Sequence, residues 1–498
     1  MKTYKQCLTL ILGTIISFQN VYASMFGFCY QEFISKTVIK TRTLNQYNMP
    51  FVDSCFSNAL LPKNQQKINI NLIASGTKSI DRTFGCEFAI NRKPIMLVAG
   101  DNTPYKKSRD INAEFIGGTN NTIAQMSLGA EESLIGGRLF IQIPFFRLWK
   151  NDFFVDWFLG IRTTLTRCTR KLDLTLAGEN NESLASIKNF FSNQVQYAKI
   201  NNEKKTDVGL ENVTLTLDGI YYSKNKDFQI YYFSGVEIPV QSNYSSEYLF
   251  APTIGGGNGT IGLILGADFR GFFATNDSYR LGMLFELEDH YFLYKTMART
   301  FDLYDRTTAN DFSSSNHQNK PWSRYLPASS LYLGLQDQTI GSFSNLPVRV
   351  HPSNVLDVSA GFIYEQKLRD RESCFLSVGY NLWASKAEYS ELQDRAYKAP
   401  YQDFYTAGIA GTAPNTSASR STIDQRAAND DTFKTLTFND LDMSSVAADG
   451  GYSQSAFFRA SIIREESFQI LFGGWYEFGK SLMIPSRIGG WIGGSLEF

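Results

Sequence analysis

Acidic residues and arginines recur at every second position in several apolar stretches of the chain. Side chains in such rows can face one common space, and rings of charge are a known means of ion selectivity. The rows hold nine acids and five arginines, so the space would weakly favour cations. Together with one histidine, the candidate pore-lining residues are Arg138, Asp156, Arg162, Asp218, Glu237, Asp268, Arg270, Arg280, Glu286, Glu288, His290, Asp357, Glu365, Arg459 and Glu477.

Residues suited to catalysis or to holding a cofactor are few. The three histidines are His290, His317 and His351, and no serine lies beside His290 in its alternating row. A hydrolase needs a nucleophile in contact with a base, so we expect no enzyme and keep a hydrolase as the weakest alternative. No GxGxxG, Walker, zinc or EF-hand pattern occurs, so we expect no cofactor and no metal. A formal charge of zero excludes a basic footprint for nucleic acid.

Each charged row alternates with an apolar row in the same stretch. In residues 152–166, Val155 and Trp157 share one face, and Asp156 and Arg162 share the other. A period of two indicates a β-strand, because a helix would mix the two sets. The alternation outlasts an ordinary strand of about 5–6 residues. It suits a tilted strand that crosses a membrane, which needs about 9–11 residues.

These stretches predict an all-β fold, a transmembrane antiparallel up-and-down β-barrel of about 14 strands, with 12 to 16 possible. Short turns between strands alternate with long polar links, as is typical of barrels that cross a membrane. The links lie at about 167–210, 241–259, 291–353 and 389–452. The strands are expected at 67–75, 82–90, 121–130, 134–143, 152–166, 211–222, 228–240, 260–273, 279–290, 354–366, 375–388, 453–463, 468–478 and 488–498.

The apolar and charged rows must face opposite sides of the barrel wall. From residue 121 onward, the middles of the apolar rows carry no Asp, Glu, Lys or Arg. A face in lipid excludes such residues, because a basic side chain at mid-bilayer costs about 2–4 kcal/mol. A soluble sandwich would have the opposite arrangement, with its apolar faces inward. The strand length and the content of 39 Phe and 26 Tyr favour apolar rows that face outward.

The N-terminus has the pattern of a secretory signal peptide at residues 1–23. Lys2 and Lys5 precede a short apolar core, and Ala23 offers a small residue at the cleavage site. Export would also permit a disulfide, for instance between Cys29 and Cys55, although these cysteines can equally fill apolar space.

The rest of the chain divides into two parts. Residues 24–66 show no sustained period, so an early strand pair, a periplasmic segment and a plug inside the barrel are all compatible with them. Residues 67–498 carry the alternating stretches and form the predicted barrel.

The last predicted strand, residues 488–498, alternates strictly and ends on an aromatic residue. It resembles the C-terminal strand of bacterial outer-membrane β-barrels, which the barrel-assembly machinery reads. The residues of this assembly signal would be Trp491, Leu496 and Phe498. In architecture, the whole of residues 67–498 resembles the porin-like class of these barrels, and no particular member is matched.

The resemblance implies a location in the outer membrane of a Gram-negative bacterium. Its partners would be outer-membrane lipid, the barrel-assembly machinery and small hydrophilic solutes. The expected function is a porin-like channel for passive diffusion of those solutes. Trp322, Arg324 and Tyr325 in the link 291–353 are candidates for a constriction, and a surface loop is the alternative that we favour slightly for this link. The alternatives are a barrel whose interior charges pair and close it, and a surface-exposed structural or adhesin-type barrel. The solute and the oligomeric state stay open.

Overall fold

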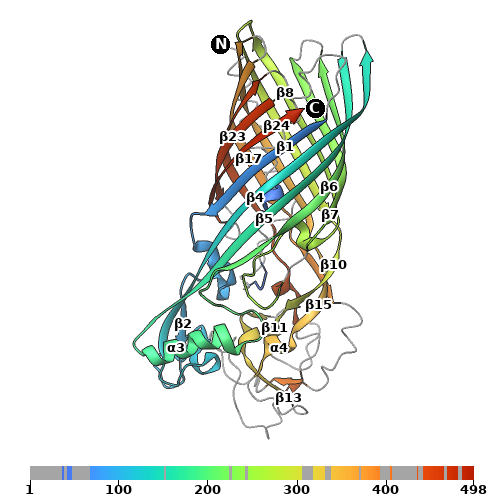
Figure 1. Cartoon of the computed structure of the whole chain (residues 1–498). Coiled ribbons are helices and arrows are strands. Elements are labelled where there is room, and N and C mark those ends of the chain that lie inside the picture. Colours follow the sequence, from blue (N-terminus) through green and yellow to red (C-terminus); the bar gives the residue numbers. More distant parts are fainter. Residues whose placement is uncertain are drawn as a thin grey trace.

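Twelve antiparallel strands close into a barrel, in which β1 pairs with β24 on one side and with β4 on the other (Figure 1). The computed structural model describes residues 36–38, 42–46, 68–150, 153–223, 227–241, 245–305, 318–330, 338–369, 372–392, 404–406, 434–435, 441–464, 468–479 and 485–497. The barrel strands are β1 (Asn69–Ser79), β4 (Ile123–Lys150), β5 (Phe153–Gly178), β6 (Lys205–Ser223), β7 (Phe228–Pro239), β8 (Gly262–Thr275), β9 (Tyr279–Phe292), β16 (Ser353–Arg369), β17 (Glu372–Ser385), β22 (Gly451–Arg464), β23 (Phe468–Gly479) and β24 (Arg487–Glu497).

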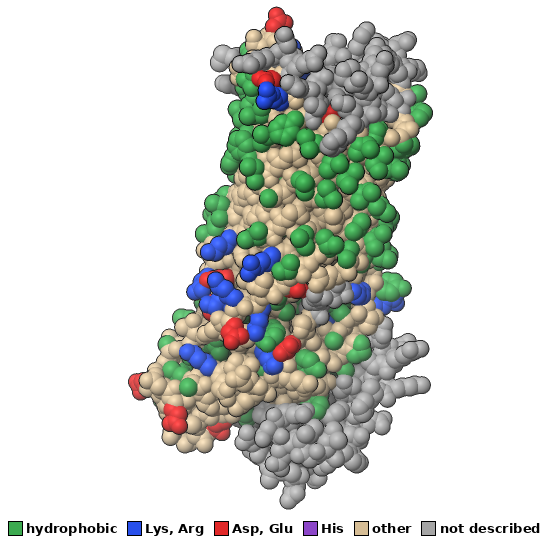
Figure 2. Space-filling model, in the orientation of Figure 1, with side chains coloured by type: hydrophobic (Ala, Val, Ile, Leu, Met, Phe, Trp, Pro, Cys, Tyr) green, Lys and Arg blue, Asp and Glu red, His purple; other side chains and the backbone are tan. Residues whose placement is uncertain are grey.

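The barrel wall is apolar outside and polar inside. Leu72, Ile135 and Ile492 are more than 60% exposed on its outer surface, whereas Asp156 and Glu286 are buried on its inner surface. Figure 2 shows the outer apolar side chains as a broad band on the face of the barrel in view. The predicted fold class, an antiparallel β-barrel with alternating faces, is therefore confirmed.

The structure has two strands fewer than the fourteen expected. Residues 82–90 were expected to form a strand, but they form the short helical turns η3 (Thr83–Phe88) and η4 (Ile90–Arg92). The expected strands 121–130 and 134–143 are one strand, β4, of 28 residues. The total of twelve remains within the expected range.

The division of β4 into two expected strands has a physical cause. The apolar residues of β4 occupy even positions at first, as in Met126 and Leu128, and odd positions later, as in Ile135 and Ile143. Even positions point inward from Ala124 as far as Gln142, before the irregularity between Pro144 and Phe146, so the first apolar set is buried and does not face lipid. The two sets are apolar for different reasons: one fills a core beyond the barrel, and the other covers the outer wall.

The two ends of the barrel differ. The strand ends at which β4 precedes β5, β6 precedes β7, β8 precedes β9, β16 precedes β17 and β22 precedes β23 lie at one end of the barrel, here named the turn end (top of Figure 1). Asn69 and Glu497 are paired at this same end. The long links lie at the other end, here named the loop end, as the alternation of link lengths predicts.

The long links fold into a layer beyond the loop end, here named the loop layer (Figure 1). It has two apolar cores, and the first packs Met96, Phe191 and Trp322 while the second packs Phe301, Ile340 and Val348. Within the part of the chain that is described, no helix is long and apolar enough to span a membrane. Besides η3 and η4, the described elements that are not part of the barrel wall are η1 (Leu44–Gln46), β2 (Met96–Ala99), β3 (Ile111–Asn112), η5 (Ala113–Ile116), α3 (Asn181–Asn189), η6 (Phe190–Gln194), η7 (Gly256–Gly259), β10 (Lys295–Thr300), β11 (Asp302–Asp305), β12 (Gln318–Lys320), η8 (Ser323–Tyr325), β13 (Pro327–Ser330), β14 (Gln338–Thr339), α4 (Ile340–Phe343), β15 (Asn345–His351), β18 (Tyr389–Leu392), β19 (Phe404–Thr406), β20 (Lys434–Thr435), β21 (Leu441–Asp442) and η13 (Met443–Val446).

Candidate functional site

The candidate site is the charged interior of the barrel. The structure places all fifteen candidate lining residues on the inner face of the wall, where fourteen are buried and Arg280 is half-buried. The alternation of the strands brings them together from nine different strands. Whether a solute passes along them stays a prediction.

Several of these charges form pairs across the interior. Arg459 donates two hydrogen bonds of 2.6 Å to the two carboxylate oxygens of Glu286. Arg280 donates to Glu365 at 2.6 Å near the turn end. Such pairs compensate much of the desolvation that burial imposes on each charge. In the conformation described here, the alternative of paired interior charges therefore fits these residues.

His290 lies between two carboxylates near the loop end. Its Nδ1 atom is 3.0 Å from Glu237, and its Nε2 atom is 2.7 Å from Glu288. A neutral imidazole has a single N–H, so it can donate to only one of the two carboxylates. Both contacts are hydrogen bonds only if the imidazole or one of the carboxylates carries an additional proton. The two partners of His290 are acids and not a hydroxyl nucleophile, so this geometry is not that of a Ser–His hydrolase.

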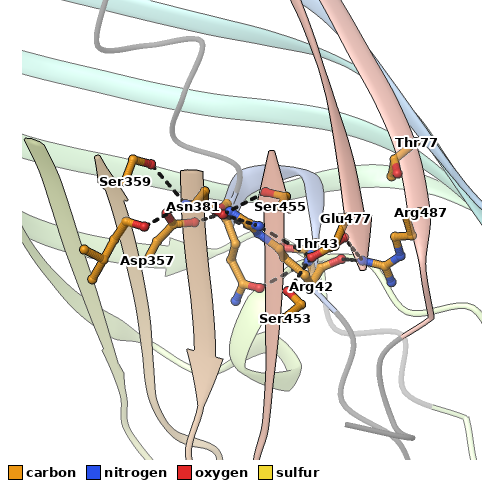
Figure 3. A network of polar contacts seen from close by, with 12 residues as sticks. Arg42, Thr43, Thr77, Asp357, Ser359, Asn381, Ser453, Ser455, Glu477 and Arg487 are labelled. Atoms are coloured by element: carbon orange, nitrogen blue, oxygen red, sulfur yellow. Dashed lines mark hydrogen bonds and ion pairs between the residues drawn. The ribbon is translucent and has the colours of Figure 1, made fainter. Parts of the chain in front are cut away.

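A short segment before the barrel, residues 42–46, lies inside it and is here named the lumen segment (Figure 3). Arg42 is completely buried and forms an ion pair with Asp357 on β16. It also donates to Asn381 on β17 at 3.0 Å and lies 3.5 Å from Glu477 on β23. One side chain of the lumen segment thus joins three strands of the wall.

The contacts of Arg42 continue into a larger polar network. Arg487 forms an ion pair with Glu132 and donates to the carbonyl oxygen of Arg42 at 3.2 Å. Arg170 donates to the same Glu132 at 2.8 Å. Glu132 and Arg170 are in step with Arg138 and Arg162 on their strands, so an extension of the alternating rows would have found them. Arg42 lies in no alternating stretch, and no sequence signal indicates it.

Apolar and aromatic side chains fill the space between these charges. Leu44 of the lumen segment packs in a core with Phe140 and Phe158. Arg162 lies over the ring of Phe233, with 4.2 Å between its guanidinium carbon and the ring centroid. The interior is therefore closely filled by side chains of both kinds at the level of the lumen segment.

The expected assembly signal divides between the two faces of β24. Trp491 points inward and packs on Trp475, with 5.5 Å between the ring centroids. Leu496 points outward and is 46% exposed. Phe498 lies outside the described residues.

The three constriction candidates lie in the loop layer, so this expectation is wrong. Trp322 donates from its indole nitrogen to the carbonyl of Phe88 at 2.6 Å. Tyr325 donates to the carbonyl of Ala198 at 2.7 Å, and Arg324 pairs with Asp302. Their role is to hold the loop layer together. The cysteines Cys29 and Cys55 lie outside the described residues, and Cys86, Cys168 and Cys374 are free thiols.

The fold is a closed antiparallel barrel that resembles those of bacterial outer membranes. No protein family model and no curated protein matches the sequence. Among solved structures, an outer-membrane channel from Pseudomonas putida F1 is similar at 8% identity, covering 88% of this chain and 100% of its own, with a TM-score of 0.37.

Two autotransporter domains show a comparable similarity. The transport unit of AIDA-I from Escherichia coli has 8% identity, 90% and 97% coverage and a TM-score of 0.34. The beta domain of Bordetella BrkA has 6% identity, 87% and 100% coverage and a TM-score of 0.35. Because identities and scores are this low, no role of any residue is taken over from these proteins.

Proposed function

We propose that this protein is an outer-membrane channel for small hydrophilic solutes, and that the lumen segment closes it in the conformation described here. The observation that carries the proposal is the position of Arg42 between Asp357 and Glu477. These contacts are polar, so water can replace them when the segment moves. The segment 24–66 would then act, at least at residues 42–46, as a plug.

The apolar outer wall supports a location in an outer membrane. Exposed side chains such as Leu159, Leu265 and Ile470 would be costly to hydrate, at about 25 cal/mol for each Å² of apolar surface. Lipid removes that cost. Short turns on the periplasmic side and long links outside are usual for such barrels, so the loop layer would face the cell exterior.

The chemistry of the interior supports a barrel that can open to solutes rather than a barrel that is permanently sealed. Buried ion pairs contribute little stability, and an apolar interior of the same volume is often as stable or more stable. Ionised side chains become favourable where water enters, and a movable plug gives water that access. Once Arg42 withdraws, Asp357 and Glu477 lose a cationic partner. The open interior would then favour cations.

Single-channel recording in planar bilayers tests the proposal. We expect rare openings from the wild-type protein and frequent, cation-selective openings from Arg42→Ala, with the reversal potential in a salt gradient giving the sign. Arg82→Ala is the matched control, because Arg82 is an exposed arginine that also pairs with two acids. The proposal fails if wild type, Arg42→Ala and a variant lacking residues 36–46 are all silent while remaining heat-modifiable on gels.

A second candidate function is binding at the cell surface. It is favoured by the loop layer, whose two apolar cores give the exposed end a folded surface of its own. Removal of residues 408–432, which lie outside the described part of the chain, would test it in a cell- or phage-binding assay. Loss of binding with unchanged conductance would assign binding to the links and transport to the barrel.

We propose no catalytic role for the interior. Phospholipid or peptide turnover by the purified protein that disappears in His290→Gln would overturn this and restore the hydrolase alternative.

A further inference from the structure

Basic side chains gather on the outer wall at the border between the apolar band and the loop layer (Figure 2). They come from or lie next to three neighbouring strands, β1, β4 and β5. This surface is here named the cationic patch. Its members are Lys78, Arg82, Arg167 and Lys171.

Two members of the patch are already neutralised by an acid. Arg82 and Lys171 both pair with Asp173, at 2.7 and 2.6 Å. Lys78 and Arg167 are exposed, and among the described residues neither has a carboxylate within 4.0 Å. Two cations on the wall therefore remain available to an external anion.

Hydroxyl groups lie beside these two cations. The strand register places Lys78, Ser133, Thr169 and Thr206 in one row across β1, β4, β5 and β6. The hydroxyls of Thr169 and Thr206 are 3.0 Å apart. Neighbouring strands are about 4.8 Å apart, and residues on one face repeat every ~6.7 Å along a strand. The backbones of Lys78 and Arg167 are thus about 12 Å apart, and their long side chains can extend toward each other from the same face of the wall.

Exposed apolar side chains lie next to the cations on the same outer face of the wall. Arg167 is directly opposite Ile135, which is 63% exposed, and Lys78 is directly opposite Ile488, which is 57% exposed. Leu165 follows on the same face of β5 at 51% exposed. A ligand that uses both parts of this surface must carry an anionic head and hydrocarbon chains.

We propose that the cationic patch binds the phosphate of an acylated lipid in the outer leaflet, with Lys78 and Arg167 as its charged ligands. The neighbouring hydroxyls can donate hydrogen bonds to the same phosphate, and Ile135, Leu165 and Ile488 contact its acyl chains. The inference rests on the proposed orientation in the outer membrane. It does not depend on whether the interior conducts.

Lipid binding to the refolded protein in detergent tests the inference, with a diphosphorylated lipid A as probe. Native mass spectrometry or a titration would compare it with the dephosphorylated lipid and with inorganic phosphate. Removing one charge, in Lys78→Gln or Arg167→Gln, should weaken binding of the phosphorylated lipid by about fivefold. Lys107→Gln removes an exposed lysine of the loop layer and should change nothing.

The possible outcomes separate the ideas. Preference for the phosphorylated lipid that is lost in the double variant supports the patch. Equal binding of both lipids, or of the double variant and wild type, overturns it, and so does equally tight binding of inorganic phosphate. A protein that is silent in bilayers but discriminates between the lipids would contradict the channel and leave the patch standing.

Discussion

The guanidinium group of Arg42 contacts the carboxylate of Asp357, a residue 315 positions later in the chain. The pair joins a segment that precedes the first barrel strand to the wall near the loop end. Since both groups are buried, neither can exchange its partner for water without movement of the segment. This contact decides whether the described conformation is closed.

Removal of the Arg42 charge should destabilise the barrel. Arg42→Met leaves Asp357 and Glu477 buried without their shared cation, and breaking a buried pair costs about 3–5 kcal/mol. Arg42→Met combined with Asp357→Asn should lose less than the sum of the two single variants. The measurement is the urea midpoint of the gel-mobility transition. Strict additivity would mean that the two residues do not interact.

The two hydrogen bonds between Arg459 and Glu286 require the planar fork of arginine. Arg459→Lys keeps the charge but loses one of the two bonds, so we expect a loss of about 1–3 kcal/mol. Arg464→Lys on the same strand is the control, because that side chain is 67% exposed. Equal midpoints for both variants would argue against the paired geometry.

Because of Glu87, we expect the stability of the loop layer to depend on pH. Burial and, to a smaller extent, the nearby Asp449 raise the pKa of Glu87 to about 7 despite its contact with Arg92. The folded form therefore holds a proton that the unfolded chain releases near its ordinary pKa of 4.5. Stability should be highest below that pH and fall as the pH rises to about 7, by roughly 3 kcal/mol at most.

Limited proteolysis of the loop layer between pH 4.5 and 8 measures this effect. Glu87→Gln should flatten the profile, because its side chain carries no charge at any pH in that range. Glu247→Gln is the control: Lys199 lowers the pKa of this exposed acid, so it titrates outside the range. A profile that keeps its slope in Glu87→Gln would assign the pH dependence to another group.

Glycine is required where tryptophan rings lie against β24 and β23. A Cβ atom added at Gly489 would overlap the ring of Trp475, and one added at Gly473 would overlap Trp491. Gly489→Ala should lower stability by about 1–3 kcal/mol through overpacking. Gly137→Ala is the control, since an added Cβ there meets nothing within 4 Å. The midpoints of the mobility transition would coincide if the Trp475 ring could move away.

The sequence predicts the barrel well where one physical rule acts over a whole strand. Asp156 and Trp157 lie on opposite faces of β5, because lipid outside and polar groups inside both impose a period of two. The rule fails in residues 82–90 and in the first part of β4. There the environment is the loop layer, and apolar residues such as Phe84 and Met126 are buried for another reason.

Contacts between residues far apart in the chain could not be predicted from a single sequence. Arg42 pairs with acids more than 300 residues away, and no local pattern indicates such a contact. Glu132 and Arg487 lie on predicted strands or their margins, yet their pairing depends on the closure of the barrel. The strand face of each candidate lining residue could be predicted from the sequence, whereas the residue with which it pairs could not.

The hairpin of β4 and β5 is far longer than a bilayer requires, with 28 and 26 residues. A strand crosses the bilayer with about 9–11 residues, so at about 3.3 Å per residue more than half of each of these two strands extends beyond the lipid. The height of the first loop-layer core above the membrane is thus set by strand length. Shortening both strands by two residues would move that core by about 7 Å along the strand direction, and every side chain would keep its face. Shortening them by one would turn Met126 and Leu128 out to water.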